Sequence, residues 1–142
     1  MAAQLSLLTP ELVSRRYPDI EKVVTKEWVE KFLKSIGTET TEYEDKQVVP
    51  HSFFSALREG EFHIIADLGI ELKQLLHVSQ SLTYKGSLIV GDTIVSKTGI
   101  AKINSRKLGG DLVVFLELYN HYYRKGEVIA EASGTVIVRE AK

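Results

Sequence analysis

The sequence of 142 residues contains no cysteine, and its formal net charge at pH 7 is only −1. The absence of cysteine excludes thiolate zinc sites, iron–sulfur ligation and a cysteine nucleophile, and it leaves the redox compartment open. The nearly balanced charge gives no basic surface of the kind that attracts nucleic acids or membrane surfaces. We therefore predict neither a nucleic-acid partner nor a membrane partner.

Targeting signals and long hydrophobic runs are also missing. Residues 1–10 contain three leucines but lack the basic region and the long apolar stretch of a signal peptide. No other run is long enough to span a bilayer. These absences predict a soluble cytoplasmic protein. The length of 142 residues predicts a single domain over residues 1–142, of which 1–14 form an N-terminal extension.

The four histidines have no i, i+4 metal-binding spacing. The acidic stretch 38–46 lacks the alternating ligands and the glycine of a calcium loop. A chain of this size also buries enough surface to fold without a metal. We therefore predict no metal and no cofactor, and we interpret 38–46 as a solvated loop.

What the sequence does contain is alternation of apolar and polar residues in its second half. Residues 76–84 alternate strictly, which predicts a strand with one face against a core. The side chains assigned to that core face are Leu76, Val78, Gln80, Leu82 and Tyr84. Strand-like runs continue through 91–104, 111–123 and 128–139, and the first two are joined by a hairpin connection at 105–110. The pattern predicts an antiparallel sheet over residues 76–139.

The first 70 residues predict the helices that cover this sheet. Thr9-Pro10-Glu11 is typical of a helix start, and Thr25 caps a second helix that Gly37 ends. Residues 52–68 predict a helix that Gly60 interrupts and Gly69 closes.

Three small residues of the last strand, Ala130, Ala132 and Gly134, leave room for a helix lying across the sheet. The predicted class is therefore α+β, with a curved antiparallel sheet wrapped around a central helix at 52–68. This is the hotdog arrangement.

Two motifs stand at the start of the predicted sheet, Leu76-His77-x-x-Gln80 and Leu88-x-x-Gly91-Asp92-Thr93, and they follow Pro50-x-Ser52-Phe53-Phe54. In this order they resemble the MaoC-like dehydratase N-terminal family, over about residues 15–139. The resemblance implies a hotdog fold and the pairing of two such folds through their sheets. It also implies an acyl thioester, of coenzyme A (CoA) or acyl carrier protein (ACP), as the ligand.

The chain departs from this family where catalysis would reside. Catalytic members carry Gly-Asp-x-Asn-Pro-x-His after the first long helix, and the aspartate and histidine move the proton at C2 of the 3-hydroxyacyl chain. In this sequence Thr38 stands at the aspartate position and Tyr43 at the histidine position. Neither side chain acts as a base near neutral pH. The resemblance therefore implies the non-catalytic A-type subunit of (3R)-hydroxyacyl-ACP dehydratases, with no catalytic residue here and a catalytic MaoC-like hotdog partner.

Five residues are candidates for contact with the acyl thioester. They are His51, Phe53, Phe54, His77 and Gln80. A structural interpretation stays open for each, because the phenylalanines suit core packing and a buried histidine or amide must be hydrogen-bonded in any fold.

Two further functions also stay open. A hotdog acyl-CoA thioesterase would use a carboxylate on the central helix, for which Glu59, Glu61 and Asp67 are available. A non-enzymatic acyl-thioester-binding homodimer is the other. The acyl chain length, and the choice between CoA and ACP and between homodimer and heterodimer, do not follow from the sequence.

Overall fold

The structure, a computed structural model, describes residues 3–37, 42–43, 46–49 and 51–140. In chain order the elements are η1 (Leu5–Leu7), η2 (Pro10–Ser14), β1 (Ile20–Val23), α1 (Lys26–Ser35), β2 (Glu42–Tyr43), β3 (Lys46–Val49), η3 (His51–Ala56), α2 (Glu59–Asp67), η4 (Leu72–Gln74), β4 (Leu75–Tyr84), β5 (Leu88–Ile89), β6 (Thr93–Leu108), β7 (Asp111–Arg124) and β8 (Glu127–Arg139).

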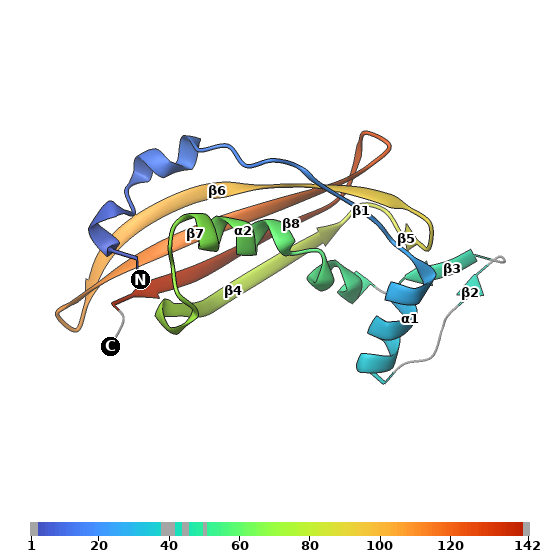
Figure 1. The fold of residues 1–142 in the computed structure, drawn as a ribbon, viewed down its shortest axis with the longest axis horizontal. Coiled ribbons are helices and arrows are strands. Elements are labelled where there is room, and N and C mark those ends of the chain that lie inside the picture. The colour runs from blue at the N-terminus through green and yellow to red at the C-terminus, as the bar shows by residue number, and fades with distance from the viewer. Residues whose placement is uncertain (1–2, 38–41, 44–45, 50, 141–142) are drawn as a thin grey trace.

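Five strands form one curved antiparallel sheet in the order β1-β6-β7-β8-β4, and α2 lies across it (Figure 1). At one end of the sheet, α1 lies beside the small sheet of β2, β3 and β5. The helix η1 and the end of β8 lie at the opposite end of the molecule (Figure 1). The predicted α+β class, a curved antiparallel sheet around a central helix, is confirmed.

The two long hairpins of the sheet use turns of only two residues. Gly109 and Gly110 have φ values of 59° and 89°, and Lys125 and Gly126 have φ values of 51° and 80°. Positive φ at both central residues is typical of the type I′ turn, whose twist matches that of the flanking strands. The predicted connection at 105–110 is therefore too long, because β6 continues to Leu108 and pairs with β7 over that stretch.

The N-terminal half of the structure agrees in part with the predictions made from the sequence. Thr25 Oγ1 accepts a hydrogen bond from the Trp28 amide at the start of α1, and Gly37 follows the helix with φ at 73°. Thr9 does not cap its helix; its hydroxyl donates to Glu11, and the helix that begins at Pro10 is a 3-10 helix. The described residues of the predicted loop 38–46 lie in strands instead, because β3 pairs with both β2 and β5.

The central helix predicted over 52–68 is divided into η3 and α2. Gly60 lies inside α2, where it marks a close approach of that helix to the sheet. A Cβ placed on Gly60 would lie 2.2 Å from Oγ1 of Thr98 on β6. The glycine therefore serves packing; the prediction that it interrupts the helix is wrong.

The face assignment of β4 is wrong over its first half. Pairing with β8 skips one residue between His77 and Ser79, which is a β-bulge. The bulge moves the alternation by one residue, so His77 shares the inner face with Gln80, Leu82 and Tyr84. Leu76 and Val78, assigned to the core, remain 50% and 51% exposed.

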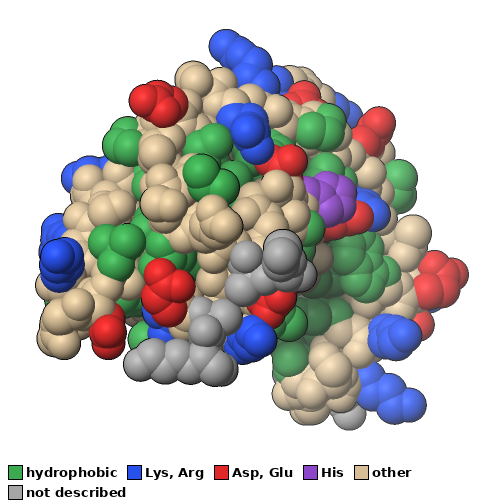
Figure 2. All heavy atoms as spheres, turned by 60° about the vertical axis from the view of Figure 1, so that its left-hand side comes forward, with side chains coloured by type: hydrophobic (Ala, Val, Ile, Leu, Met, Phe, Trp, Pro, Cys, Tyr) green, Lys and Arg blue, Asp and Glu red, His purple; other side chains and the backbone are tan. Residues whose placement is uncertain are grey.

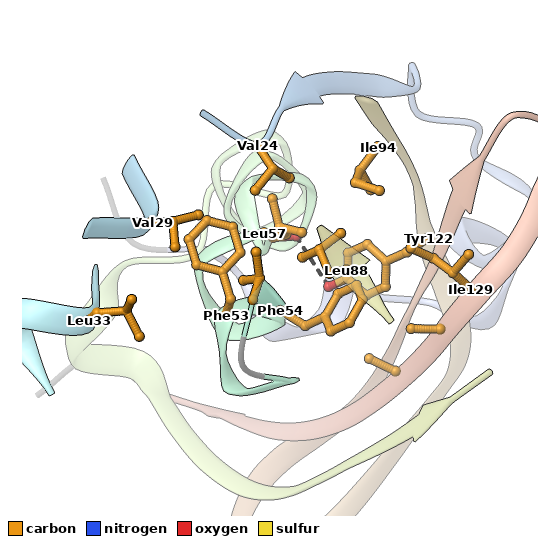
Figure 3. Close-up of a cluster of buried hydrophobic side chains, with 13 residues drawn as sticks. Val24, Val29, Leu33, Phe53, Phe54, Leu57, Leu88, Ile94, Tyr122 and Ile129 are labelled. Carbon is orange, nitrogen blue, oxygen red and sulfur yellow. Dashed lines mark hydrogen bonds between the residues drawn. The ribbon is translucent and has the colours of Figure 1, made fainter. Parts of the chain in front are cut away.

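Two hydrophobic clusters fill the space between the helices and the sheet. The first lies beside α1 and η3, where Tyr122 is buried and donates a hydrogen bond to the Leu57 carbonyl (Figure 3). The second lies under α2 and includes Leu5 and Leu8 of the N-terminal segment. The stretch predicted as an N-terminal extension, residues 1–14, thus contributes side chains to the core.

The contact between Gly60 and Thr98 leads to a stability prediction. Gly60→Ala adds a methyl group where no space exists, so we expect it to lower the free energy of unfolding by about 1–3 kcal/mol. Gly86→Ala is the matched control, because its new Cβ would meet its nearest neighbours at 3.5 Å, an ordinary contact. Urea unfolding of both variants measures the difference, and equal stability would contradict the packing role of Gly60.

Candidate functional site

A band of polar residues crosses the inner face of the sheet between the two hydrophobic clusters. On β6, Ser96 and Thr98 separate Ile94 of the first cluster from Ile100 of the second. On β7, the buried Asn120 lies between Tyr122 and Leu118 and accepts a hydrogen bond from the Thr98 hydroxyl. The band continues to Gly134 on β8 and to Gln80 and His77 on β4. We call these residues the polar band.

Glu61 faces the polar band from the first turn of α2. Its side chain is only 7% exposed, and Arg58, which is 26% exposed, donates a hydrogen bond to its Oε2. A buried carboxylate must be paired to be stable, and Arg58 supplies that pairing. A separation of three residues brings the two side chains together on one side of the helical turn.

Gly134 lies beneath Glu61 at a position where a side chain would meet neighbours on several sides. A Cβ placed on Gly134 would lie 3.9 Å from Glu61 Oε1, 3.8 Å from His77 Nε2 and 3.3 Å from the Ser79 carbonyl oxygen. Gln80 pairs directly with Gly134, so its side chain belongs to the same face. A carboxylate, an imidazole and a backbone carbonyl therefore take up the room around Gly134.

An apolar pocket of about 460 Å³ lies on the other side of Arg58. Its wall includes Trp28 of α1, Ile20 of β1, Leu57 and Phe62, together with Ser96 of the polar band. Lys22 and Glu59 form an ion pair of 2.9 Å among the lining residues. A volume of this size, lined mainly by apolar groups with a few polar ones, suits a small organic ligand.

Phe53 and Phe54, two of the predicted contact residues, are fully buried in the first cluster (Figure 3). The Phe53 ring meets Trp28 and Phe32 edge to face, with centroid separations of 4.8 and 5.2 Å. Phe54 packs on Tyr122 at 4.9 Å. Neither phenylalanine lines the apolar pocket, although Phe53 supports the tryptophan that does.

The remaining predicted positions separate into two groups. His77 and Gln80 come together at Gly134, as described above. Thr38 lies outside the described residues, as do the side chains of Tyr43 and His51. A role in binding stays a prediction for each of the five contact residues.

The three carboxylates considered for a thioesterase differ sharply in environment. Glu59 and Asp67 are exposed and paired with Lys22 and Arg15. The hydrogen bond from Arg15, together with one from Tyr17, holds the pKa of Asp67 below its ordinary value. Glu61 alone of the three is buried and faces the sheet.

Arg58 was not among the residues predicted from the sequence. Its spacing of three residues from Glu61 is the signal that would have found it. Tyr122, close by, stays a neutral hydrogen-bond donor, because burial raises the pKa of its phenol and the negative charge of Glu61 raises it further.

On the face shown in Figure 2, charged side chains of both signs are interspersed, and a hollow on its right-hand side is bordered by hydrophobic side chains. Within the described part of the chain, no cluster of three histidine, aspartate or glutamate side chains has a metal-binding arrangement. No described helix has the length and apolarity needed to cross a membrane.

The sequence matches the family model described as FAS1-like, dehydratase domain region, over residues 11–132. The chain belongs to this family. A search of curated protein sequences gives no match. Membership in a dehydratase family agrees with the resemblance to MaoC-like dehydratases found in the sequence motifs.

Several solved structures share the fold. A chain of the truncated HadBC (3R-hydroxyacyl-ACP dehydratase) complex from Mycobacterium tuberculosis has a TM-score of 0.70 and 18% identity, covering 86% of this chain and 92% of that one. The (R)-hydratase from A. caviae involved in PHA biosynthesis has a TM-score of 0.63 and 15% identity, covering 84% and 91%. A MaoC-like dehydratase has a TM-score of 0.72 and 16% identity; the match covers 92% of this chain and 44% of the dehydratase chain. The predicted hotdog fold is confirmed.

The ion pair between Arg58 and Glu61 leads to an asymmetric prediction. Arg58→Met removes both the donor and the charge, which leaves a buried carboxylate without its partner, and we expect it to lower the free energy of unfolding by about 2 kcal/mol or more. Glu61→Gln leaves a guanidinium that is one-quarter exposed and can reach water, so its cost is expected to be smaller. Urea unfolding of both variants tests this order, and a larger loss for Glu61→Gln would contradict it.

Proposed function

We propose that this FAS1-like dehydratase domain is the substrate-holding subunit of a heteromeric (R)-specific 3-hydroxyacyl-thioester dehydratase of fatty-acid metabolism. In this role it binds an acyl-CoA or acyl-ACP and closes the acyl pocket, while a catalytic MaoC-like hotdog chain supplies the acid–base pair. We propose that it acts in the cytoplasm.

The observation that carries this proposal is the combination of the family's fold with an altered catalytic motif. Residues 11–132 match the dehydratase model, yet Thr38 and Tyr43 stand where catalytic relatives carry aspartate and histidine. Dehydration of a 3-hydroxyacyl thioester needs a group that exchanges a proton at C2, and neither residue does so near neutral pH. The acid–base pair must then come from elsewhere.

The edge strand β4 supports a partner at the sheet. β4 is ten residues long and lies at the end of the strand order, and within the described residues its outer edge pairs with no other strand. Its Leu76 and Val78 are half-exposed. A long edge with exposed apolar groups promotes association with another strand. The HadBC structure is itself a complex of two kinds of chain.

The apolar pocket supports an acyl ligand. Trp28, Ile20, Leu57 and Phe62 offer an apolar wall for the tail, and Arg58 connects this wall to the polar band. An acyl thioester has the matching division into an apolar chain and a polar head.

The division of labour between two chains can be tested directly. The isolated chain is expected to give no measurable hydration of crotonyl-CoA, because the catalytic pair is missing, whereas the complex copurified from the native host is expected to be active. Absorbance of the enoyl thioester follows the reaction. Appreciable turnover by the purified chain alone would overturn the assignment as a non-catalytic subunit.

The role of β4 as the pairing edge can be tested by placing a charged side chain on this strand. Leu76→Lys places a charge on the edge and is expected to reduce copurification of the partner about tenfold. Leu108→Lys is the matched control, since Leu108 is also a strand leucine that is 50% exposed but lies at the β6–β7 hairpin. Affinity purification with quantitative mass spectrometry measures the yield, and an equal yield for the two variants would reject the β4 interface.

A further inference from the structure

A second pocket, of about 410 Å³, lies between the segment that leads into β1 and the strands β6 and β7. Residues 13–17 and Asp19 form one wall, and Lys97, Thr98 and Tyr119 form the other. It shares no lining residue with the apolar pocket. Because three cationic side chains line it, we call it the cationic pocket.

The positive charge of the cationic pocket is only partly neutralised. Its cations are Arg15, Arg16 and Lys97, and one carboxylate, that of Asp19, lines it as well. Asp19 lies 3.5 Å from Lys97 and both side chains are half-exposed, so this ion pair is weak. Asp67 pairs with Arg15 at 2.8 Å from outside the pocket. No carboxylate that the structure describes pairs with Arg16, so the charge of this side chain is available to a ligand.

The opposite wall contributes a hydroxyl group that the fold does not use. Tyr119 of β7 lies directly opposite Gly99 of β6, and a Cβ placed on Gly99 would lie 2.3 Å from Tyr119 Oη. The phenol ring therefore lies over the glycine, an arrangement that stabilises a sheet through the ring alone. Among the described residues, none forms a hydrogen bond with the Tyr119 hydroxyl. This leaves a donor at the wall of the cationic pocket.

We propose that the cationic pocket binds a phosphate group through Arg16, Lys97 and Tyr119. A phosphate monoester carries a charge of about −1.5 to −2 at pH 7 and offers acceptor oxygens only. Guanidinium, ammonium and phenol groups all donate, and the guanidinium fork matches two phosphate oxygens at once. The three residues bind the ligand, and no bond of the ligand is made or broken.

The arrangement of the donors favours phosphate over a carboxylate. Arg16 belongs to one wall of the pocket, and Lys97 and Tyr119 belong to the other. Donors that approach from different directions suit the tetrahedral oxygens of phosphate, whereas the two oxygens of a carboxylate lie in one plane. The site does not depend on the proposed dehydratase role, because it takes no part in holding the acyl chain.

The size of the cationic pocket indicates that the phosphate belongs to a larger molecule. A volume of about 410 Å³ lies within the range of small-molecule sites and exceeds what a bare phosphate ion fills. Val13 and the ring of Tyr17 add apolar surface beside the cations. Free phosphate presents the same kind of oxygen atoms, so the experiment must separate the ion from the ester.

Isothermal titration of the full chain with adenosine 3′-monophosphate, adenosine and inorganic phosphate tests the inference. The wild type is expected to bind the monoester, to bind inorganic phosphate more weakly and to bind adenosine not at all. Arg16→Met removes the donors and the charge, and it is expected to weaken binding of the monoester about tenfold or more. Lys102→Met is the matched control, because it removes an exposed cation of β6 outside the pocket; it is expected to change the affinity by less than about twofold.

A third variant separates binding from packing. Tyr119→Phe keeps the ring over Gly99 and removes only the hydroxyl, so the melting temperature is expected to stay unchanged. The affinity for the monoester is expected to fall about fivefold, as the loss of one hydrogen bond to a charged group predicts. Melting curves of all three variants confirm that each one is folded.

The outcomes decide the assignment. Absence of phosphate-dependent binding to the wild type overturns it, as does an equal loss of affinity in Arg16→Met and Lys102→Met, which would reflect the overall charge alone. Unchanged affinity in Tyr119→Phe also overturns the site as described. Inorganic phosphate that binds as tightly as the monoester supports the site and identifies the free ion as its ligand. None of these results depends on whether the chain takes part in hydration of crotonyl-CoA.

Discussion

The close contact between α2 and the sheet is the constraint on which the site depends. Gly60 brings the helix backbone against Thr98 on β6, nearer than any residue with a side chain would permit. The next residue is Glu61. Because the helix packs so closely on the sheet, the Glu61 carboxylate is buried and lies over β8. Arg58, one turn earlier, keeps that carboxylate stable there.

The bulge in β4 has two consequences at once. It turns His77 toward Gly134 and the polar band, and it leaves Leu76 and Val78 half-exposed on the strand at the end of the sheet. An inward-facing histidine and two exposed apolar residues therefore lie side by side in the sequence.

Much of the architecture could be predicted, because it follows from local patterns. The alternation in β7 and β8, the Thr25 cap and the small residues at Ala130, Ala132 and Gly134 all report the environment of a few adjacent residues. The candidate site was only partly predictable. His77 and Gln80 were predicted as contact residues, but on opposite faces of the strand. The alternation of apolar and polar residues did not reveal the β-bulge that brings them to the same face.

By itself, the sequence determined the α+β class, the long strands of the sheet and membership of the dehydratase family. Only the tertiary structure decided which of three helical carboxylates is buried, and that His77 and Gly134 accompany it. The physical reason is distance along the chain. Periodicity reports which face of an element is apolar, whereas the meeting of residues 61, 77 and 134 depends on how far a helix sinks into a curved sheet and where one strand gains an extra residue.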